Sequence, residues 1–344
     1  MPAEPGRGRL LFRVDGGRIA GVSLGHVFRC LALARELDAA GRDCLFLMRA
    51  DPRGPAVVRE RGFAVVEFGP EVDLEGQRRL IAALDPDLVV VDLLRPDLAT
   101  LAACRLPDRP QVLLDDLGGV AARSDLVVNG SAVAANRYYP DAPGELLLGP
   151  DYMVLGPEFR GRPAPAIAEY PVRVLVTLGG SDPAGLAGVV LESMAEVMAT
   201  DGITFIAGPA FAAGPGRRET LEIMKTRFRV QENVPDLSMS LMSADLVVTA
   251  GGRTAYELAA LGIPALVVPT CGHEVETARA LAAEGSCLAV SGCEPGRIRA
   301  EIAGLLDEAA DPERRRAMSR AGRALVDGRG GERVSRAMIA LVGD

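Results

Sequence analysis

The sequence predicts an α/β protein with two doubly wound parallel sheets that face each other across a cleft. Three observations support this fold class: short Val- and Leu-rich runs alternate with longer amphipathic stretches, the alternation restarts after residue 170, and one Pro/Gly-rich segment separates the two series. Strands that alternate with helical stretches are typical of parallel sheets covered by helices. Ligands of such sheets bind at the carboxyl ends of the strands, so function is expected in the loops that follow them.

In the first half of the chain, several apolar runs are too short for helices and predict buried strands. These runs are Leu10–Val14, Cys44–Met48, Ala64–Phe68, Leu88–Val91 and Val112–Leu114. Helical patterns lie between them, for example at Val27–Ala40 and Glu75–Leu84. We therefore expect residues 1–150 to form an N-terminal domain.

The second half repeats this alternation and predicts a second domain over residues 172–344. Its expected strands are Val172–Leu178, Ile203–Ala207, Leu246–Thr249, Ala265–Val268 and Cys287–Val290, and its expected helices lie near 184–199, 218–227, 253–261 and 274–284. Residues 151–171 are rich in proline and glycine and predict the linker. The chain is helical from residue 294 onward, and its last helix is able to pack back on the first domain.

Composition excludes several classes of protein. The length of 344 residues suits two domains of about 150 residues each. The net charge of −8 argues against a broad nucleic-acid surface. No apolar stretch is long enough for a membrane span, and Arg13 inside the first apolar run argues against a signal peptide. The six cysteines are dispersed without a C-x-x-C pair, which predicts buried free thiols, no metal site and a reducing, cytoplasmic compartment.

His26 is one of only two histidines and follows a predicted strand and a glycine-containing loop. We expect a helix to begin at about His26, where the helix dipole keeps the imidazole neutral and able to accept a proton. Arg29 lies one turn further on, where it binds an anionic substrate group, pairs with Asp15, or only ties the helix to the loop. The alternative for His26 is an ordinary surface or hydrogen-bonded histidine.

The segment from Thr249 to Glu257 is a stronger candidate for ligand binding. A strand ends at Thr249, Gly251 and Gly252 make a turn, and a helix then starts with exposed amides. Such an arrangement predicts an anion site suited to a diphosphate, with Glu257 accepting hydrogen bonds from ribose hydroxyls. A plain Gly-Gly turn with a solvated glutamate is the alternative.

Two further strand ends carry weaker signals. Gly179–Gly180 lets a ligand approach the backbone closely, and Asp182 before Pro183 predicts the N-cap of a helix. Asp115–Asp116 resembles half a metal site, but no histidine or further carboxylate is nearby in the sequence. We therefore assign this pair to a strand end and turn.

Together these motifs resemble a known family. Arg13–Asp15 and Gly25–Leu31 resemble the opening of the UDP-sugar hydrolases of pseudaminic acid, a nonulosonate, which are related to the spore-coat polysaccharide biosynthesis proteins. Three further segments look like the same family, Leu147–Tyr152, Pro157–Arg160 and Leu178–Asp182. The segment Asn233–Glu257 is also similar to glycosyltransferases of the GT-B fold, such as the one that completes lipid II. The resemblance covers nearly the whole chain.

The resemblance implies a GT-B fold of two Rossmann-like domains that hydrolyses a UDP-linked amino-deoxy sugar without a cofactor or metal ion. His26 is then the general base that activates water for attack on the anomeric carbon, releasing UDP and free sugar, and we count Asp15 and Arg29 with the catalytic residues. Uracil is expected near Val230–Val234. We assign substrate binding to Gly25, Gly179, Gly180, Ser181, Asn233, Val234, Gly251, Gly252, Arg253, Thr254, Glu257, His273 and Glu274.

The chain differs from the family's pattern on the sugar side of the expected site. Leu94 stands where an aromatic hydroxyl is common, and His273–Glu274 replaces an Asn-Gln pair. We expect His273 to bond a phosphate or sugar hydroxyl and Glu274 to cap the following helix. Two alternatives to hydrolysis stay open: a UDP-sugar-dependent glycosyltransferase in which His26 deprotonates an acceptor hydroxyl, and a non-catalytic nucleotide-sugar-binding protein.

Overall fold

The computed structural model describes residues 8–343 except 18–23, 120–123, 138, 140–143, 181, 183, 209–210, 212–215, 233 and 235–236. The chain divides into two compact units. Unit 1 contains the chain up to Pro157 together with the segment from Arg329 onward, and unit 2 is Glu158–Gly328. The Pro/Gly-rich segment 151–171 is therefore divided between the two units.

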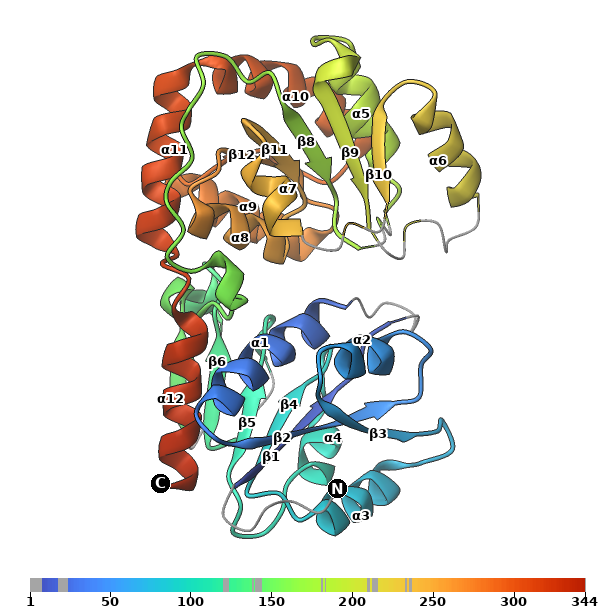
Figure 1. Cartoon of the computed structure of the whole chain (residues 1–344), viewed down its shortest axis with the longest axis vertical. Helices are drawn as coiled ribbons and strands as arrows, with labels where there is room; N and C mark the ends of the chain where they lie inside the picture. Colours follow the sequence, from blue (N-terminus) through green and yellow to red (C-terminus); the bar gives the residue numbers. More distant parts are fainter. Residues whose placement is uncertain are drawn as a thin grey trace. The chain divides into compact units, whose positions relative to one another are not determined.

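Unit 1 is built on a seven-stranded parallel sheet in the order β3-β2-β1-β4-β5-β6-β7 (Figure 1). Alternate residues of the central strand enter two separate hydrophobic clusters, with Leu10 and Phe12 in one and Leu11 in the other. Because successive side chains of a strand point to opposite faces, both faces of this sheet are buried. The strands are β1 (Arg9–Val14), β2 (Asp43–Arg49), β3 (Ala64–Phe68), β4 (Leu88–Asp92), β5 (Gln111–Leu114), β6 (Leu126–Asn129) and β7 (Glu145–Leu148).

Helix α12 (Gly330–Val342) completes unit 1, although it follows unit 2 in the sequence. It packs against α1 (Gly25–Ala39), and its buried residues Val334 and Met338 join the same cluster as Leu10 (Figure 1). The other helices of this unit are α2 (Gly54–Glu60), α3 (Leu74–Leu84), α4 (Leu98–Ala103) and the short 3-10 helices η1 (Ala134–Asn136) and η2 (Pro150–Tyr152). The first domain is therefore formed from two separate stretches of the chain.

Strands β6 and β7 are not among the strands that the sequence analysis predicts. Each has four residues, and each lies beside a loop rather than a long amphipathic helix. Strands of this length are recognised by the helical stretches between them, and in the described part of the chain only the 3-10 helix η1 lies between β5 and β7. These strands become recognisable only through their pairing with β5 and with each other.

Unit 2 is built on a six-stranded parallel sheet in the order β10-β9-β8-β11-β12-β13 (Figure 1). Val176 of β8 and Val248 of β11 are fully buried in one cluster with residues of α5 and α10. The strands are β8 (Val174–Thr177), β9 (Ile203–Ala207), β10 (Arg229–Glu232), β11 (Leu246–Thr249), β12 (Ala265–Val267) and β13 (Leu288–Ala289). The predicted fold class, two parallel-sheet α/β domains, is confirmed.

The first helix of unit 2 starts later than predicted. Helix α5 (Ala187–Ala195) has Leu186 as its N-cap, so the expected N-cap at Asp182 is wrong, and Pro183 lies outside the described residues. Asp182 instead reaches the helix from its preceding loop, where its carboxylate accepts bonds from Leu186 N at 2.9 Å and Ala187 N at 3.1 Å. The other helices are η3 (Pro157–Phe159), η4 (Thr200–Gly202), α6 (Arg217–Lys225), α7 (Leu237–Met242), α8 (Arg253–Leu261), α9 (Gly272–Ala283), α10 (Pro295–Ala310) and α11 (Pro312–Leu325).

Strand β10 is also absent from the sequence prediction. It lies at the edge of the sheet, and its charged and polar side chains are exposed. Its one apolar residue, Val230, is half-buried. Charged residues on an edge strand discourage pairing with another chain, and they also remove the apolar pattern that identifies a strand.

Both sheets reverse their strand order at a single place. The reversal lies between β1 and β4 in unit 1 and between β8 and β11 in unit 2. At the carboxyl ends of these pairs, Val14 is aligned with Asp92 and Thr177 with Thr249. The loops that leave two such strands run to opposite sides of the sheet, so these ends are the places where ligands bind.

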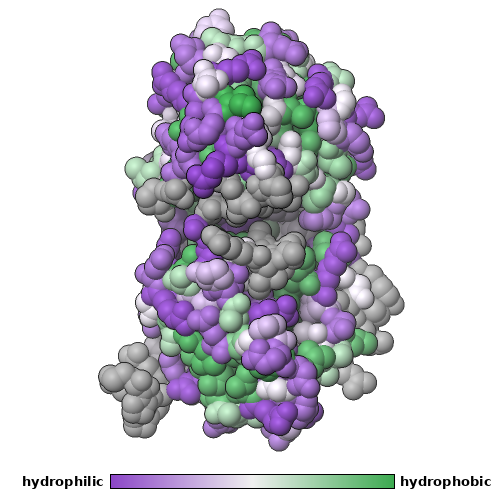
Figure 2. All heavy atoms as spheres, turned by 90° about the vertical axis from the view of Figure 1, so that its right-hand side faces the viewer, coloured by the Kyte–Doolittle hydropathy of each residue, from purple (hydrophilic) through white to green (hydrophobic). Residues whose placement is uncertain are grey.

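The exposed large hydrophobic residues are scattered. In the face drawn in Figure 2, hydrophobic residues lie among hydrophilic ones. The exposed large hydrophobic residues are Phe28, Leu94, Leu98 and Leu146 in unit 1, and Tyr170, Val172, Val197, Ile223 and Met239 in unit 2. Within the described residues, no helix combines the length and apolar character that a membrane crossing requires.

All six cysteines are free thiols, and four of them are buried. Burial raises the pKa of Cys104 to about 11 and that of Cys44 and Cys287 to about 12. Such thiols are neutral and unreactive, and they serve as small apolar residues of the core. Cys271 and Cys293, both in unit 2, are only half-buried.

Candidate functional site

The strand reversal of unit 1 carries a histidine–aspartate pair. Helix α1 begins at Gly25, directly before His26, and β4 ends at Asp92. His26 Nδ1 lies 2.7 Å from Asp92 Oδ1, and Asp92 is fully buried whereas 13% of the His26 side chain is exposed. An ionised carboxylate only accepts hydrogen bonds, so Nδ1 is the donor and Nε2 is left to exchange a proton.

Arg29 holds the same carboxylate from one helical turn further along α1. Its Nε donates to Asp92 Oδ2 at 2.8 Å and its Nη2 to Asp92 Oδ1 at 2.7 Å. The other edge of the guanidinium pairs with both carboxylate oxygens of Asp116, at 3.1 Å from Nη2 to Oδ2. Two bidentate contacts of this kind fix the plane of the guanidinium and, through Asp92, the orientation of the imidazole.

Of the alternatives for Arg29, the pairing with Asp15 is wrong. Asp15 is paired with Arg13, whose Nη1 and Nη2 lie 2.7 and 2.9 Å from the two carboxylate oxygens. Asp15 Oδ1 also accepts a bond from the backbone N–H of Arg49 at 2.8 Å. Both ionic side chains are buried, so this carboxylate ties the end of β1 to β2 and none of its described contacts reaches His26.

Charges around His26 change its protonation from that expected for a helix start. Burial lowers the pKa of His26. The charge of Asp92 and the hydrogen bond to it outweigh this effect, so the pKa lies above its ordinary value. For Asp92, burial raises the pKa, yet the charges of Arg29 and His26 outweigh it and hold the pKa well below the usual range. The neighbouring carboxylate, rather than the helix dipole, therefore sets the basicity of this imidazole.

Asp92 is the functional residue that sequence reasoning missed, and Asp116 was assigned only to a turn. Asp92 is the last residue of an apolar strand, and that strand lies next to β1 at the strand reversal. The available signal was an acidic residue at the carboxyl end of a buried strand, where a charge is expensive unless it is paired. Its partner was not visible, because only the strand order shows that β4 neighbours β1.

Asp115 supports Asp116 from a separate polar network. Asp115 Oδ2 accepts bonds from the hydroxyl of Tyr139 at 2.7 Å and from the backbone N–H of Gly118 at 2.6 Å. Asn129 Nδ2 in turn donates to the Tyr139 oxygen at 2.8 Å. These bonds fix the loop after β5, so Asp116 meets Arg29 from a held backbone.

In unit 2, the turn between β11 and α8 presents backbone amides at a strand reversal. Gly252 is the N-cap of α8 and has no side chain to occupy the first N–H groups. Gly251 is required by packing, since a Cβ there would lie 2.7 Å from Glu274 Cβ and 2.8 Å from Glu274 O. The close contact with α9 fixes the turn, and the amides of Arg253 and Thr254 begin the helix behind it.

Glu257 lies one turn into α8 and is buried. Arg253 Nε donates to Glu257 Oε1 at 3.1 Å. Burial raises the pKa of Glu257 above its ordinary value, although the charge of Arg253 acts in the opposite direction. In the described part of the chain, two buried atoms at this turn have no hydrogen-bond partner, Thr249 Oγ1 and Arg253 Nη1. A ligand that bonds to these groups removes the penalty of leaving them unpaired.

The other predicted binding residues of unit 2 are only partly brought together. Gly179 has a φ of +81°, and Gly179–Gly180 lies against Gly208, whose Cα approaches too closely for a side chain. Ser181 and Asn233 lie outside the described residues, whereas Val234 is half-buried. The backbone therefore supplies most of what this part of the site can offer.

The start of α9 holds His273 and Glu274. Glu274 Oε2 accepts bonds from Thr270 N at 2.7 Å and Thr270 Oγ1 at 2.8 Å, so this carboxylate ties the helix to the preceding turn. His273 is exposed, and its Nδ1 lies 3.3 Å from Cys271 Sγ.

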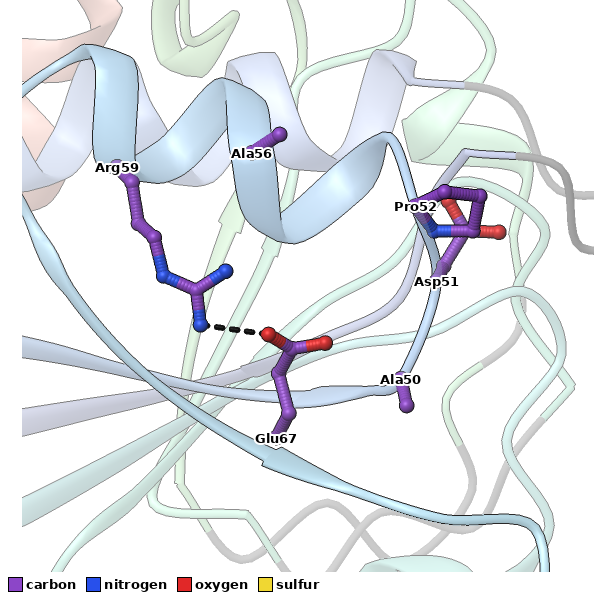
Figure 3. A pocket seen from close by; sticks show the side chains of 6 residues that line it. All are labelled: Ala50, Asp51, Pro52, Ala56, Arg59 and Glu67. Atoms are coloured by element: carbon purple, nitrogen blue, oxygen red, sulfur yellow. Dashed lines mark hydrogen bonds and ion pairs between the residues drawn. The ribbon is translucent and has the colours of Figure 1, made fainter.

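An open hollow of about 460 Å³ lies elsewhere in unit 1, between α2 and β3 (Figure 3). Its lining residues are Ala50, Asp51, Pro52, Ala56, Arg59 and Glu67. Arg59 points at Glu67 and pairs with it, and Asp51 accepts bonds from the backbone N–H groups of Arg53 and Gly54. The charged groups satisfy one another, so this hollow offers no group for chemistry.

Comparison with known proteins gives relatives over most of the chain. The spore coat polysaccharide biosynthesis protein SpsG of Bacillus subtilis (strain 168) is 29% identical over 332 residues, which are 93% of this chain and 95% of that protein. The UDP-N-acetylglucosamine--N-acetylmuramyl-(pentapeptide) pyrophosphoryl-undecaprenol N-acetylglucosamine transferase of Ralstonia nicotianae is 29% identical over 312 residues, 79% of this chain and 82% of that protein. No model of a known protein family matches the chain.

Among solved structures, MurG of Acinetobacter baumannii aligns with a TM-score of 0.63 at 16% sequence identity, covering 97% of this chain and 99% of that one. At this identity the likeness shows the fold, which is that of GT-B glycosyltransferases. The chain is thus similar to a spore coat polysaccharide protein and to MurG-like transferases, whereas a particular likeness to the hydrolases of pseudaminic acid biosynthesis stays a prediction.

Proposed function

We propose that this protein is a nucleotide-sugar-dependent glycosyltransferase, in which unit 2 holds the donor diphosphate and His26 of unit 1 activates the acceptor hydroxyl. The observation that carries the proposal is the His26–Asp92 pair at the strand reversal of unit 1, with Arg29 locking its geometry. A base of this kind serves a reaction that removes a proton from a weak acid. The MurG-like relatives are named as transferases, which favours transfer over the hydrolysis that the sequence analysis put first.

The donor is assigned to unit 2 because its amides and glycines suit a diphosphate. The uncapped start of α8 directs backbone N–H groups and the positive end of the helix dipole at an anion. Glu257 then accepts hydrogen bonds from ribose hydroxyls, and the two unpartnered groups of Thr249 and Arg253 supply further contacts. We assign the nucleotide to UDP on the name of the transferase relative.

The proposed reaction is a displacement at the anomeric carbon. Nε2 of His26 takes the proton of the acceptor hydroxyl, and the oxygen of that hydroxyl forms the new bond to the anomeric carbon. The bond from that carbon to the diphosphate oxygen breaks, and the diphosphate leaves with the electron pair. Asp92 stabilises the imidazolium that forms, and the amides of α8 offset the charge on the departing phosphate.

Water as the acceptor would give hydrolysis by the same steps, so one experiment separates the two reactions. UDP release from a panel of UDP-sugars is measured with and without candidate acceptors, and the products are identified by mass spectrometry. We expect release to rise with an acceptor and the glycosylated product to appear. Release at the same rate without acceptor, with free sugar as the product, would contradict transfer.

The role of His26 is tested by His26→Ala, with Asp38→Ala at the far end of α1 as the matched control. Loss of a general base is expected to lower kcat by about 10²- to 10⁴-fold. UDP binding, measured by calorimetry, is expected to stay unchanged because unit 2 is intact. Wild-type turnover in the variant would place the base elsewhere, whereas UDP binding without turnover in the wild type would identify the protein as a nucleotide-sugar binder.

A further inference from the structure

Three side chains with metal-ligating atoms gather at the start of α9 in unit 2. They are Cys271, the N-cap of the helix, and His273 and Glu274 in its first turn. One ligand atom from each, a thiol sulfur, an imidazole nitrogen and a carboxylate oxygen, lies within 4.8 Å of the other two. The cluster is the one place in the described residues where three such groups converge.

The sulfur–nitrogen distance in the cluster matches that of a tetrahedral metal site. Zinc binds sulfur at about 2.3 Å and nitrogen at about 2.0–2.1 Å, and a tetrahedral angle then places sulfur and nitrogen about 3.6 Å apart. Cys271 Sγ lies 3.5 Å from His273 Nε2 and 3.3 Å from Nδ1.

The carboxylate of this cluster is already oriented. Both of its described hydrogen bonds, from Thr270 N and Thr270 Oγ1, go to Glu274 Oε2. Metal-binding carboxylates are commonly held in this way through one oxygen while the other coordinates the ion. The tight contact of Gly251 with the backbone of Glu274 further fixes the helix start.

We propose that Cys271, His273 and Glu274 form a binding site for a divalent transition-metal ion of the zinc class, with a fourth coordination position open to water or an anion. Thiolate and imidazole ligands favour such an ion over magnesium or calcium, which take oxygen ligands. Three protein ligands with an open position are typical of zinc sites that bind a further molecule. This metal site follows from its own three side chains and does not rest on the transfer reaction proposed above.

The site is tested by titrating the chelator-treated protein with Co²⁺ and following the thiolate-to-cobalt absorption band, with Zn²⁺ as the competitor. We expect one ion per chain and loss of the band on addition of Zn²⁺. Cys271→Ala is expected to abolish the band, and His273→Ala and Glu274→Gln to weaken binding by at least tenfold. Thr270→Ala, which frees the carboxylate, is expected to weaken binding about 10- to 100-fold.

Two matched controls keep the outcome specific. Cys293→Ala removes the other half-buried thiol and His26→Ala removes the only other imidazole, and both are expected to bind Co²⁺ like the wild type. Circular dichroism shows that each variant is folded. Absence of the band in the folded wild type, or its persistence in Cys271→Ala, overturns the proposal.

Discussion

The start of α1 in unit 1 and the start of α8 in unit 2 each follow one strand of a strand reversal, β1 for α1 and β11 for α8, but they carry different groups. The first is filled by charged side chains that bind one another, His26 and Arg29 against Asp92 and Asp116. The second is lined by glycine backbone with one buried pair, Arg253–Glu257. Charged side chains that bind one another hold an imidazole in a fixed orientation, which suits proton transfer. Backbone amides without side-chain partners suit the binding of a charged ligand.

The two buried carboxylates show the same difference. Asp92 has two cationic partners, and its pKa falls despite complete burial. Glu257 has one cationic partner, Arg253, and burial prevails so that its pKa rises. The charged groups of the unit 1 site are thus paired with one another, whereas a ligand bound at the unit 2 site would be stabilised by further hydrogen bonds.

Asp92→Asn tests the completeness of the unit 1 site and is expected to have the largest effect on stability. Arg29 loses the charge of its buried partner, which is expected to lower the free energy of unfolding by about 3–5 kcal/mol. Urea unfolding measures this loss, and Asp38→Asn on the exposed end of α1 serves as the control, expected within about 0.5 kcal/mol of the wild type. Equal stability of the two variants would show that the pair contributes little.

The same variant changes the pH dependence in a direction fixed by the charges. His26 acts as a base only when neutral, so the wild-type rate is expected to fall as pH drops through its raised pKa. Without the Asp92 charge this acid limb moves to lower pH, and kcat falls on the order of 10²-fold. Because pairing lowers the pKa of Asp92, its stabilisation is present above about pH 4 and is lost as pH falls further. An acid limb at the same pH in the wild type and the variant would show that Asp92 does not set the pKa of the base.

Gly251→Ala tests whether the unit 2 turn is fixed by packing, with Gly252→Ala as its matched control. The new Cβ at 251 would lie 2.7 Å from Glu274 Cβ, so a loss of about 1–3 kcal/mol is expected. At 252 the nearest atom is 3.4 Å away, at the end of the Glu274 side chain, and φ is −87°, so the loss is expected to stay below about 1 kcal/mol. Thermal unfolding compares the two, and the reverse order would refute the packing role.

Glu257→Gln tests the ligand role of the unit 2 carboxylate and has the smallest expected effect. The amide keeps the shape but loses the charge that accepts two hydroxyls, so UDP binding is expected to weaken about tenfold, or about 1.4 kcal/mol. Calorimetry measures the affinity, and Glu192→Gln on the exposed face of α5 is the control. Unchanged affinity would assign Glu257 to the structural pair with Arg253 alone.

Much of the fold was predictable because it depends on local patterns. Buried strands such as Leu10–Val14 are apolar runs between amphipathic helices, and the predicted parallel-sheet class is confirmed. Strands β6 and β10 were not predictable, since in the described part of the chain no amphipathic helix separates the first from the strand before it, and the second is polar at the edge. Local pattern carries no information about elements that exist only through their neighbours.

The site was predictable to a smaller extent. The Gly-Gly turn and His26 stand out in sequence because their spacing after a strand has a direct chemical meaning. The partners of His26 and Arg29 do not, since Asp92 and Asp116 lie 66 and 90 positions after His26 and come near it only through the strand order. Asp15 is nearer in the sequence, but it pairs with Arg13.

Helix α12 determines how this molecule can be assembled. Val334 and Met338 complete the core of unit 1, whose strands all lie before Pro157. This core therefore stays incomplete until the chain beyond unit 2 has been synthesised. Unit 2 is one continuous stretch and contains all of its own strands. Unit 1 is therefore synthesised first but completed last. A truncation before Arg329 removes α12 and so exposes the core of unit 1, although the cut lies after unit 2 in the sequence.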